Sequence, residues 1–461
     1  MTEAADLTLV DLLPRLRDRS LSARELLADC VARVDRHEPS VRAFVTLTPD
    51  LAGTAAAAAD QARAAGRPVG PLAGVPVALK DLYLTRGVPT TASSRVLEGY
   101  DPGVDAEVWV RLRDAGAGLI GKTTLHEFAY GTGSHPTRNP WDLSRTPGGS
   151  SGGSGAALAA RMVPVATGTD TGGSLRIPAA ACGLSSLRAT AGRVSAHGAL
   201  PLAHSLDATG PMARRMRDVS LLLRLLAGHD PRDPHSLDAQ VPDYPDAGPE
   251  DLRGVRIGLP TSFFWDDVDE QIAAACHVGL QRLVDRGAVL VDVDPPLATP
   301  EVLAVPGTYG HTMGPEALAH HAAWLADREE LYGEGIRHRF AEARQTTSER
   351  YEQAQRDRVR WRASWRAVFE AARLDALAHP TIPQPPPAQP DEGRGAGPTI
   401  ALAKAWPLAG FPALSVPTGL DDRGLPVGLQ LAGLPEQEAA LVGLGITLDE
   451  DVRLWELPAP L

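Results

Sequence analysis

Short apolar runs alternate with helix-forming segments along most of this 461-residue chain, and this alternation limits the folds open to it. Residues 74–79 and 288–293 are runs of this kind, and each follows a stretch rich in helix-forming residues. Strands that alternate with helices pack as a parallel or mixed sheet beneath layers of helices. The pattern therefore predicts an α/β fold.

The remaining elements are predicted from the same patterns. Ser22 and Glu25 form a capping box at the start of a helix, and we expect helices throughout the N-terminal residues 1–66. Further helices are predicted at 105–115, 216–228, 270–286, after 436 and across a charged segment at 339–373, and further strands at 117–120, 255–259, 375–378, 412–417 and 428–433. Residues 230–249 and 380–398 are rich in proline, so we expect loops there, the second extended or mobile.

The composition excludes several classes of function. A formal net charge of −12 argues against nucleic acid as a partner, since phosphates require a basic surface. No apolar run approaches the roughly 20 residues of a membrane span, and the first residues lack the features of a secretory signal. The cysteines Cys30, Cys182 and Cys276 lie far apart, and the histidines form no metal-binding motif. We therefore expect a cytoplasmic protein with no metal centre.

Lysine is scarce in this chain. It stands only at Lys80, Lys122 and Lys404, and arginine supplies every other basic side chain. Arginine keeps its proton in proteins, whereas a buried lysine can lose its proton and act as a base. Lys80 follows directly on the apolar run at 74–79, which makes it the best-placed candidate; the alternative is an ion pair with Asp81 or another acid.

Two glycine-rich motifs supply candidate serines within a small-residue region at about 131–192. Ser150 lies in TPGGSSGGS, which ends at residue 154, and Ser174 lies in GTDTGGSLRIP, which begins at residue 168. The first motif also fits a flexible linker, and the second an ordinary turn between strand and helix. No histidine has a partner motif, so a neutral lysine is the base that such a serine requires.

The turn around Ser174 also offers backbone hydrogen-bond donors and a flanking pair of opposite charges. The backbone N–H groups of Thr171, Gly172, Gly173 and Ser174 can point one way, which is the arrangement of an oxyanion hole. Asp170 and Arg176 flank this turn, and we expect them to pair and brace it.

A phosphate-loop match competes with this interpretation. GAGLIGKT at residues 116–123 fits G-x-x-x-x-G-K-[ST], but a phosphate loop must leave a strand and open a helix. Here the helical period comes first and the apolar run follows. Nucleotide binding is therefore the weaker hypothesis, testable by titrating ATP against a Lys122→Ala variant.

Taken together, three segments resemble the amidase signature family: GVPVALKD at 74–81, GGSSGGS at 148–154 and TDTGGSLRIPAA at 169–180. The resemblance extends over nearly the whole chain, and the interval between Ser150 and Ser174 fits the family pattern. It implies one α/β/α domain over residues 1–461, with a large mixed sheet and a catalytic core at 74–192.

The resemblance also implies a mechanism without cofactors. Ser174 attacks the amide carbonyl, and Ser150, held on a cis peptide, passes the proton to neutral Lys80. Residues 171–174 form the oxyanion hole, and Ala129 and Tyr130 line the acyl pocket.

Two segments depart from the family pattern. The Lys-Pro-Thr usually found soon after residues 182–184 is replaced within Ser-Ser-Leu-Arg-Ala-Thr at 185–190. The M-Y-x-x-D-like segment of the glutaminase subunit of tRNA amidotransferases is missing near 395–403. We therefore predict a free-standing amidase for small or aryl amides, with esters or carbamates as further substrates and with a homodimer as a possible assembly. The alternative is that glutaminase subunit.

Overall fold

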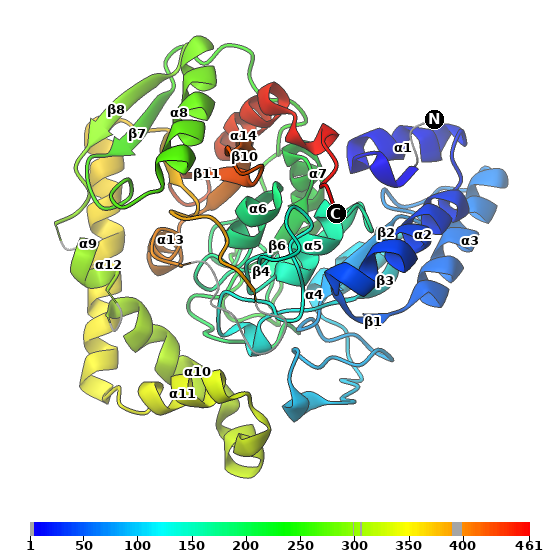
Figure 1. Cartoon of the computed structure of the whole chain (residues 1–461), viewed down its shortest axis with the longest axis horizontal. Helices are drawn as coiled ribbons and strands as arrows, with labels where there is room; N and C mark the ends of the chain where they lie inside the picture. Colours follow the sequence, from blue (N-terminus) through cyan, green and yellow to red (C-terminus); the bar gives the residue numbers. More distant parts are fainter. Residues whose placement is uncertain (1–3, 298, 305–306, 390–398) are drawn as a thin grey trace.

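The computed structural model describes residues 4–461 except 298, 305–306 and 390–398, and its core is one mixed sheet (Figure 1). Eleven strands are present in the described part, in the order β1-β3-β2-β4-β6-β5-β10-β11-β9-β7-β8. The strands are β1 (Phe44–Leu47), β2 (Pro76–Lys80), β3 (Gly118–Thr123), β4 (Val165–Thr169), β5 (Ser185–Arg188), β6 (Thr209–Ala213), β7 (Arg256–Pro260), β8 (Val289–Val293), β9 (Ala376–Pro380), β10 (Ala413–Leu420) and β11 (Pro426–Ala432). The predicted α/β class with a large mixed sheet is confirmed.

Helices cover this sheet and extend beyond it (Figure 1). They are α1 (Leu9–Asp18), α2 (Ala23–Val41), α3 (Pro49–Ala64), α4 (Glu107–Asp114), α5 (Gly152–Ala159), α6 (Arg176–Cys182), α7 (Met216–Leu226), α8 (Glu270–Asp285), α9 (Thr299–Val302), α10 (Thr308–Arg328), α11 (Glu334–Ala343), α12 (Ser348–Ala372), α13 (Ala405–Ala409) and α14 (Glu438–Val452). The N-terminal helices lie near β1 to β3, whereas α10 to α12 form a lobe at the other side of the molecule. No helix in the described residues is long and apolar enough to cross a membrane.

The parallel pair β2 and β3 positions the first site residues. Every residue of both strands is buried, which explains why the sequence shows continuous apolar runs there. In their register Leu79 pairs with Lys122 and Lys80 with Thr123, so two lysines end neighbouring strands.

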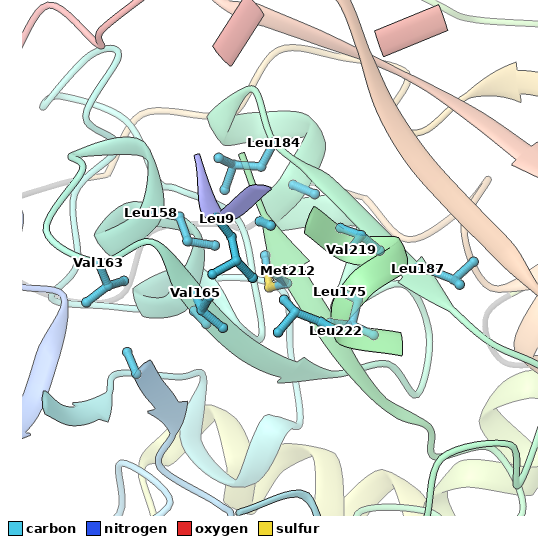
Figure 2. Packing of buried hydrophobic residues seen from close by; sticks show 14 of the residues in the cluster. Leu9, Leu158, Val163, Val165, Leu175, Leu184, Leu187, Met212, Val219 and Leu222 are labelled. Atoms are coloured by element: carbon cyan, nitrogen blue, oxygen red, sulfur yellow. The ribbon is translucent and has the colours of Figure 1, made fainter. Parts of the chain in front are cut away.

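A hydrophobic cluster holds the next two strands in place (Figure 2). Val165 of β4 and Met212 of β6 are fully buried and share one cluster with Leu158 of α5 and Leu222 of α7. This packing fixes the end of β4, from which the segment carrying Ser174 departs.

The strands predicted from apolar runs are all present, with their ends shifted by a few residues, but β1, β4, β5 and β6 were not predicted. The sequence of β4, VATGT, is built of small and polar residues with little strand propensity. It needs small side chains because its neighbours are close: a Cβ on Gly168 would lie 2.7 Å from the Ser151 hydroxyl oxygen. Packing, rather than propensity, forms these strands.

The prediction of one helical segment across 339–373 is wrong. The segment forms two helices instead, because α11 ends before α12 begins. The side chain of Thr347 accepts a hydrogen bond from the Arg350 N–H and caps the start of α12. The first proline-rich segment, 230–249, contains neither helix nor strand, as predicted for a loop. The second begins at Pro380, which is the last residue of β9, and its residue Gln389 is buried. The rest of the loop predicted to be mobile, 390–398, lies outside the described residues.

Candidate active site

Lys80 ends β2 and is fully buried. Its Nζ donates hydrogen bonds to the Ser150 Oγ at 2.8 Å and to the Thr169 Oγ1 at 2.7 Å. Burial lowers the pKa of Lys80 to about 7, although the buried carboxylates of Asp207 and Asp170 oppose this shift. Much of Lys80 is therefore neutral at neutral pH, as a base must be.

Ser150 lies in the loop before α5, and the peptide bond between Gly149 and Ser150 is cis. The Ser150 carbonyl accepts hydrogen bonds from the Ser134 hydroxyl at 3.2 Å and from the His126 N–H at 3.1 Å. These contacts fix the backbone so that the Ser150 hydroxyl meets the amine of Lys80. The structure thus brings two of the three predicted relay residues into direct contact.

Ser174 lies on the turn that joins β4 to α6, and a buried ion pair closes this turn. Arg176 contacts the Asp170 carboxylate twice, from Nη2 to Oδ1 and from Nε to Oδ2, both at 2.9 Å. Burial alone would raise the pKa of Asp170, but the Arg176 guanidinium outweighs it and holds the pKa below its ordinary value. The predicted bracing pair is confirmed.

The backbone of this turn leaves several donors unused. Gly173 has a φ of +127°, and its N–H donates to Asp170 Oδ1 at 2.9 Å. Within the described residues, the N–H groups of Thr171, Gly172 and Ser174 have no acceptor. The Ser174 hydroxyl likewise has no partner there, so the structure does not place it in hydrogen-bond contact with Ser150.

Ser174 opens on a cavity of about 600 Å³, which suits a small organic ligand. Thr171 and Gly172 line it beside Ser174, and Ala129 and Tyr130 form part of its wall. A larger hollow of about 760 Å³ between α10 and α12 contains none of the predicted site residues among its described walls.

The wall that carries Ala129 has a constrained backbone. Phe128 and Ala129 have φ values of +49° and +61°, which lie in a backbone region that residues other than glycine rarely adopt. The Phe128 ring packs 4.5 Å from the His321 ring and 5.4 Å from the Trp324 ring, measured between centroids. Such strain persists only where the surroundings enforce it, so α10 holds this wall in shape.

The surroundings of Lys122 are those of a lysine that stabilises the fold through an ion pair. It is buried in β3, its Nζ lies 3.1 Å from Asp81 Oδ1, and it donates to the Tyr83 carbonyl at 2.9 Å. Residues 116–123 run from the end of α4 into β3, the reverse of a phosphate loop, so the phosphate-loop interpretation is wrong. The proposed ion pair of Lys80 with Asp81 is also wrong, because Asp81 pairs with Lys122.

Three further residues at this site were not predicted. Thr169 stands inside a quoted motif, yet only the fold shows that its hydroxyl meets Lys80. Arg188, in the segment that departs from the family pattern, donates to the Asp170 carbonyl behind the turn. Tyr309 of α10 lines the cavity, and no local pattern marks it.

Known proteins match this chain in sequence and structure over almost its entire length. The family model described as Amidase matches residues 25–442. The chain belongs to the amidase signature family.

This amidase-family enzyme acts on C–N bonds. Individual relatives align with it over nearly its full length. The A subunit of the glutamyl-tRNA(Gln) amidotransferase of Chloroflexus aurantiacus is 41% identical, with 96% of each chain covered. The structure of a bacterial aryl acylamidase superposes with a TM-score of 0.88 at 26% identity, over 99% of both chains. The structure of the corresponding amidotransferase subunit from Thermotoga maritima superposes with a TM-score of 0.81 at 29% identity, covering 98% of this chain and 96% of the other.

These relatives correct one prediction about the amidase. The expected partners were a small-molecule amide substrate and, in a possible homodimer, a second copy of the chain. That expectation is wrong because it includes no other protein: two curated relatives, which match 96% and 100% of the chain, are each named as a subunit of an amidotransferase.

Proposed function

We propose that this chain hydrolyses an amide through an acyl-enzyme, with Ser174 as nucleophile, Ser150 as proton carrier and Lys80 as base. The observation that carries the proposal is the 2.8 Å contact between Lys80 and Ser150, made by a lysine that has no carboxylate in hydrogen-bond contact among the described residues. A buried lysine bonded only to hydroxyls is suited to exchange a proton with them.

The reaction proceeds in two halves. Neutral Lys80 accepts the proton of the Ser150 hydroxyl while Ser150 accepts that of Ser174, and the Ser174 oxygen attacks the carbonyl carbon. The proton returns through Ser150 to the amide nitrogen, the C–N bond breaks, and the amine or ammonia leaves. Water then attacks the acyl-serine with the same relay as base, releasing the acid and restoring Ser174.

The turn at 171–174 stabilises the oxyanion of each tetrahedral intermediate. The N–H groups of Thr171, Gly172 and Ser174 lack acceptors among the described residues, and Gly173 shares its N–H with Asp170. Losing one donor from such a hole typically costs about 3 kcal/mol of barrier. Ala129 and Tyr130 hold the acyl group on the facing wall.

We further propose that the chain performs this hydrolysis as one component of a glutamyl-tRNA(Gln) amidotransferase, releasing ammonia from glutamine for a partner protein. The support is the identity of 41% to the Chloroflexus aurantiacus protein over 96% of both chains. Expression with a tag in its native host should recover partner proteins, and ammonia release from glutamine should increase when they are present. Unaided turnover of glutamine by a chain that purifies alone contradicts this part of the proposal.

A free-standing amidase is the second candidate. It is favoured by the segment Thr399 to Lys404, which holds no acidic residue where a glutaminase subunit is expected to have one, and by the likeness to an aryl acylamidase. A panel of aryl amides, esters and carbamates, assayed beside glutamine, separates the two. Rapid hydrolysis of an aryl amide with no turnover of glutamine selects this candidate.

A further inference from the structure

His379 of β9 is a fully buried histidine that the proposed relay does not use. In the antiparallel register of β9 and β11 it pairs with Gln430, which is also fully buried. Paired residues of neighbouring strands direct their side chains to the same face of a sheet, and the Gln430 Nε2 lies 2.8 Å from the His379 Nε2. The rings of Phe264 and Trp406 enclose this contact, with centroids 4.7 and 5.7 Å from that of the imidazole.

The groups around Gln430 fix the orientation of its amide. Arg176 donates from Nη1 to the Gln430 Oε1, and the same Nη1 donates to the Ala403 carbonyl at 2.9 Å. A guanidinium has only donors, so the amide oxygen must face Arg176. The amide NH₂ group then faces His379 and donates to its Nε2. Gln430 thus connects Arg176 to the imidazole through one amide group.

The same reasoning fixes the protonation of His379. The indole N–H of Trp406 also donates to the His379 Nε2, at 3.1 Å, and an indole nitrogen cannot accept. The proton of the neutral ring therefore stands on Nδ1, which donates to the Pro380 carbonyl at 2.8 Å. Burial lowers the pKa of His379 to about 3, although the Pro380 carbonyl opposes this shift. His379 is thus a neutral acceptor at neutral pH.

Arg176 carries this contact to the nucleophile turn. It donates to both oxygens of the Asp170 carboxylate, at 2.9 Å in each case. Asp170 in turn accepts the Gly173 N–H at 2.9 Å and the Leu175 N–H at 3.3 Å. These two N–H groups flank Ser174, whose own N–H is one of the proposed oxyanion donors. A change in the position of Arg176 therefore moves the carboxylate that shapes the turn.

We propose that His379 is a positioning residue for the oxyanion turn, and that it acts through Gln430 and Arg176. The inference rests on the proposed amide hydrolysis and adds a residue that the motifs around the serines do not contain. The imidazole Nε2 holds the Gln430 amide with its oxygen toward Arg176, and Arg176 holds the Asp170 carboxylate beneath the turn. Without this acceptor, the Gln430 amide has a buried donor left unpaired and rotates toward another acceptor, so Arg176 loses one of its hydrogen bonds.

Labelling of Ser174 by a fluorophosphonate measures the effect without a known substrate. The phosphonyl oxygen occupies the oxyanion hole in the transition state, so the maximal labelling rate at saturating probe depends on the turn. We expect His379→Met to lower that rate by about 10- to 100-fold, because a displacement of about 1 Å can cost about 100-fold. The probe concentration that gives half the maximal rate should stay unchanged, since an interaction made only in the transition state does not affect binding.

Three further variants make the outcome specific. His379→Gln is matched in length and shape to His379→Met but keeps an acceptor near the imidazole Nε2, so it should recover most of the rate. Gln430→Met repeats the test from the other end of the contact, and the double variant should be no slower than either single one, because the two residues act as a unit. Asp218→Ala removes the carboxylate that accepts the Leu9 and Val10 N–H groups at the start of α1, and it should leave the rate unchanged.

Hydrogen exchange follows the turn itself, whatever the reaction. The N–H groups of Gly173 and Leu175 are protected by Asp170, so peptides that cover residues 169–180 should exchange faster in folded His379→Met than in the wild-type chain. Peptides from β1 and α3 should keep their exchange rates. An equal increase in all peptides would show a loss of global stability and would overturn the positioning role.

The possible results are distinguishable. A wild-type labelling rate in folded His379→Met, no recovery in His379→Gln, or losses that multiply in the double variant overturns the role of His379. If Ser174 is not labelled in the wild-type chain, the proposed function fails, and exchange at 169–180 still decides whether His379 holds the turn. If Ser174 is labelled but exchange at 169–180 does not respond to His379→Met, the function stands and the inference about His379 fails.

Discussion

Lys80 and Lys122 lie at the ends of two adjacent parallel strands, both fully buried, yet their surroundings differ in one respect. Lys122 is 3.1 Å from the carboxylate of Asp81, whereas the hydrogen-bond partners of Lys80 among the described residues are the hydroxyls of Ser150 and Thr169. Burial lowers the pKa of both lysines, but Asp81 in direct contact opposes that shift at Lys122. The charge of the partner therefore decides whether a buried lysine is a structural cation or a base.

The largest expected effect is the loss of turnover in Lys80→Met. Removing a general base typically costs about 10²- to 10⁴-fold, and we expect the upper end because Ser150 depends on Lys80 for its proton transfer. Steady-state assays of the best substrate measure kcat/KM, and circular dichroism checks the fold. Retention of more than about a tenth of the wild-type kcat/KM contradicts the base assignment.

Lys122→Met should act through stability instead. It leaves Asp81 buried without its cation, which typically costs about 3–5 kcal/mol of unfolding free energy. Urea unfolding measures this cost, and activity per folded molecule should remain unchanged. Converting Asp81 to Asn in the same chain should recover part of the loss, whereas an additive or larger loss shows that the ion pair is not the cause.

The pH dependence separates the two lysines in a second way. A base works when unprotonated, so kcat/KM should rise with pH and level off above the pKa of Lys80, about 7. Below that pH the rate should fall about tenfold for each pH unit. The folded Lys122→Met chain should keep the same midpoint, and a midpoint near the ordinary lysine pKa would show that Lys80 is not the titrating group.

A smaller shift is expected when Thr169 becomes Val. The ammonium of Lys80 loses one acceptor, so its charged form is less favoured and the pKa falls further. The midpoint of the pH profile should move to lower pH, with at most a modest loss of the plateau rate. A shift to higher pH means that Thr169 does not stabilise the charged lysine.

Much of this site could be predicted because local sequence encodes it. The apolar run at 74–79 indicated the strand that places Lys80, and the paired glycines indicated the turns around Ser150 and Ser174. The different partners of Lys80 and Lys122 could not be predicted, because they depend on the register of two strands and on the distant residue Thr169. Strand β4 escaped prediction since its small residues form a strand only under the packing of α5 and its neighbours.

The prediction of the partners was wrong for a different reason. Assembly with other proteins depends on surfaces outside the catalytic turn, and the motifs around Ser150 and Ser174 describe only the reaction. The missing M-Y-x-x-D-like segment near 395–403 favours a free-standing amidase. The 41% identity to an amidotransferase subunit over 96% of both chains supports the other proposal.

Covalent labelling tests the relay most directly. A fluorophosphonate reacts with a serine only where a base activates it, and peptide mass spectrometry locates the adduct. We predict modification of Ser174 in the wild-type chain, at a similar rate in folded Lys122→Met and at least about 100-fold more slowly in Lys80→Met. Modification of another serine, or of Ser174 at the wild-type rate without Lys80, would contradict the account.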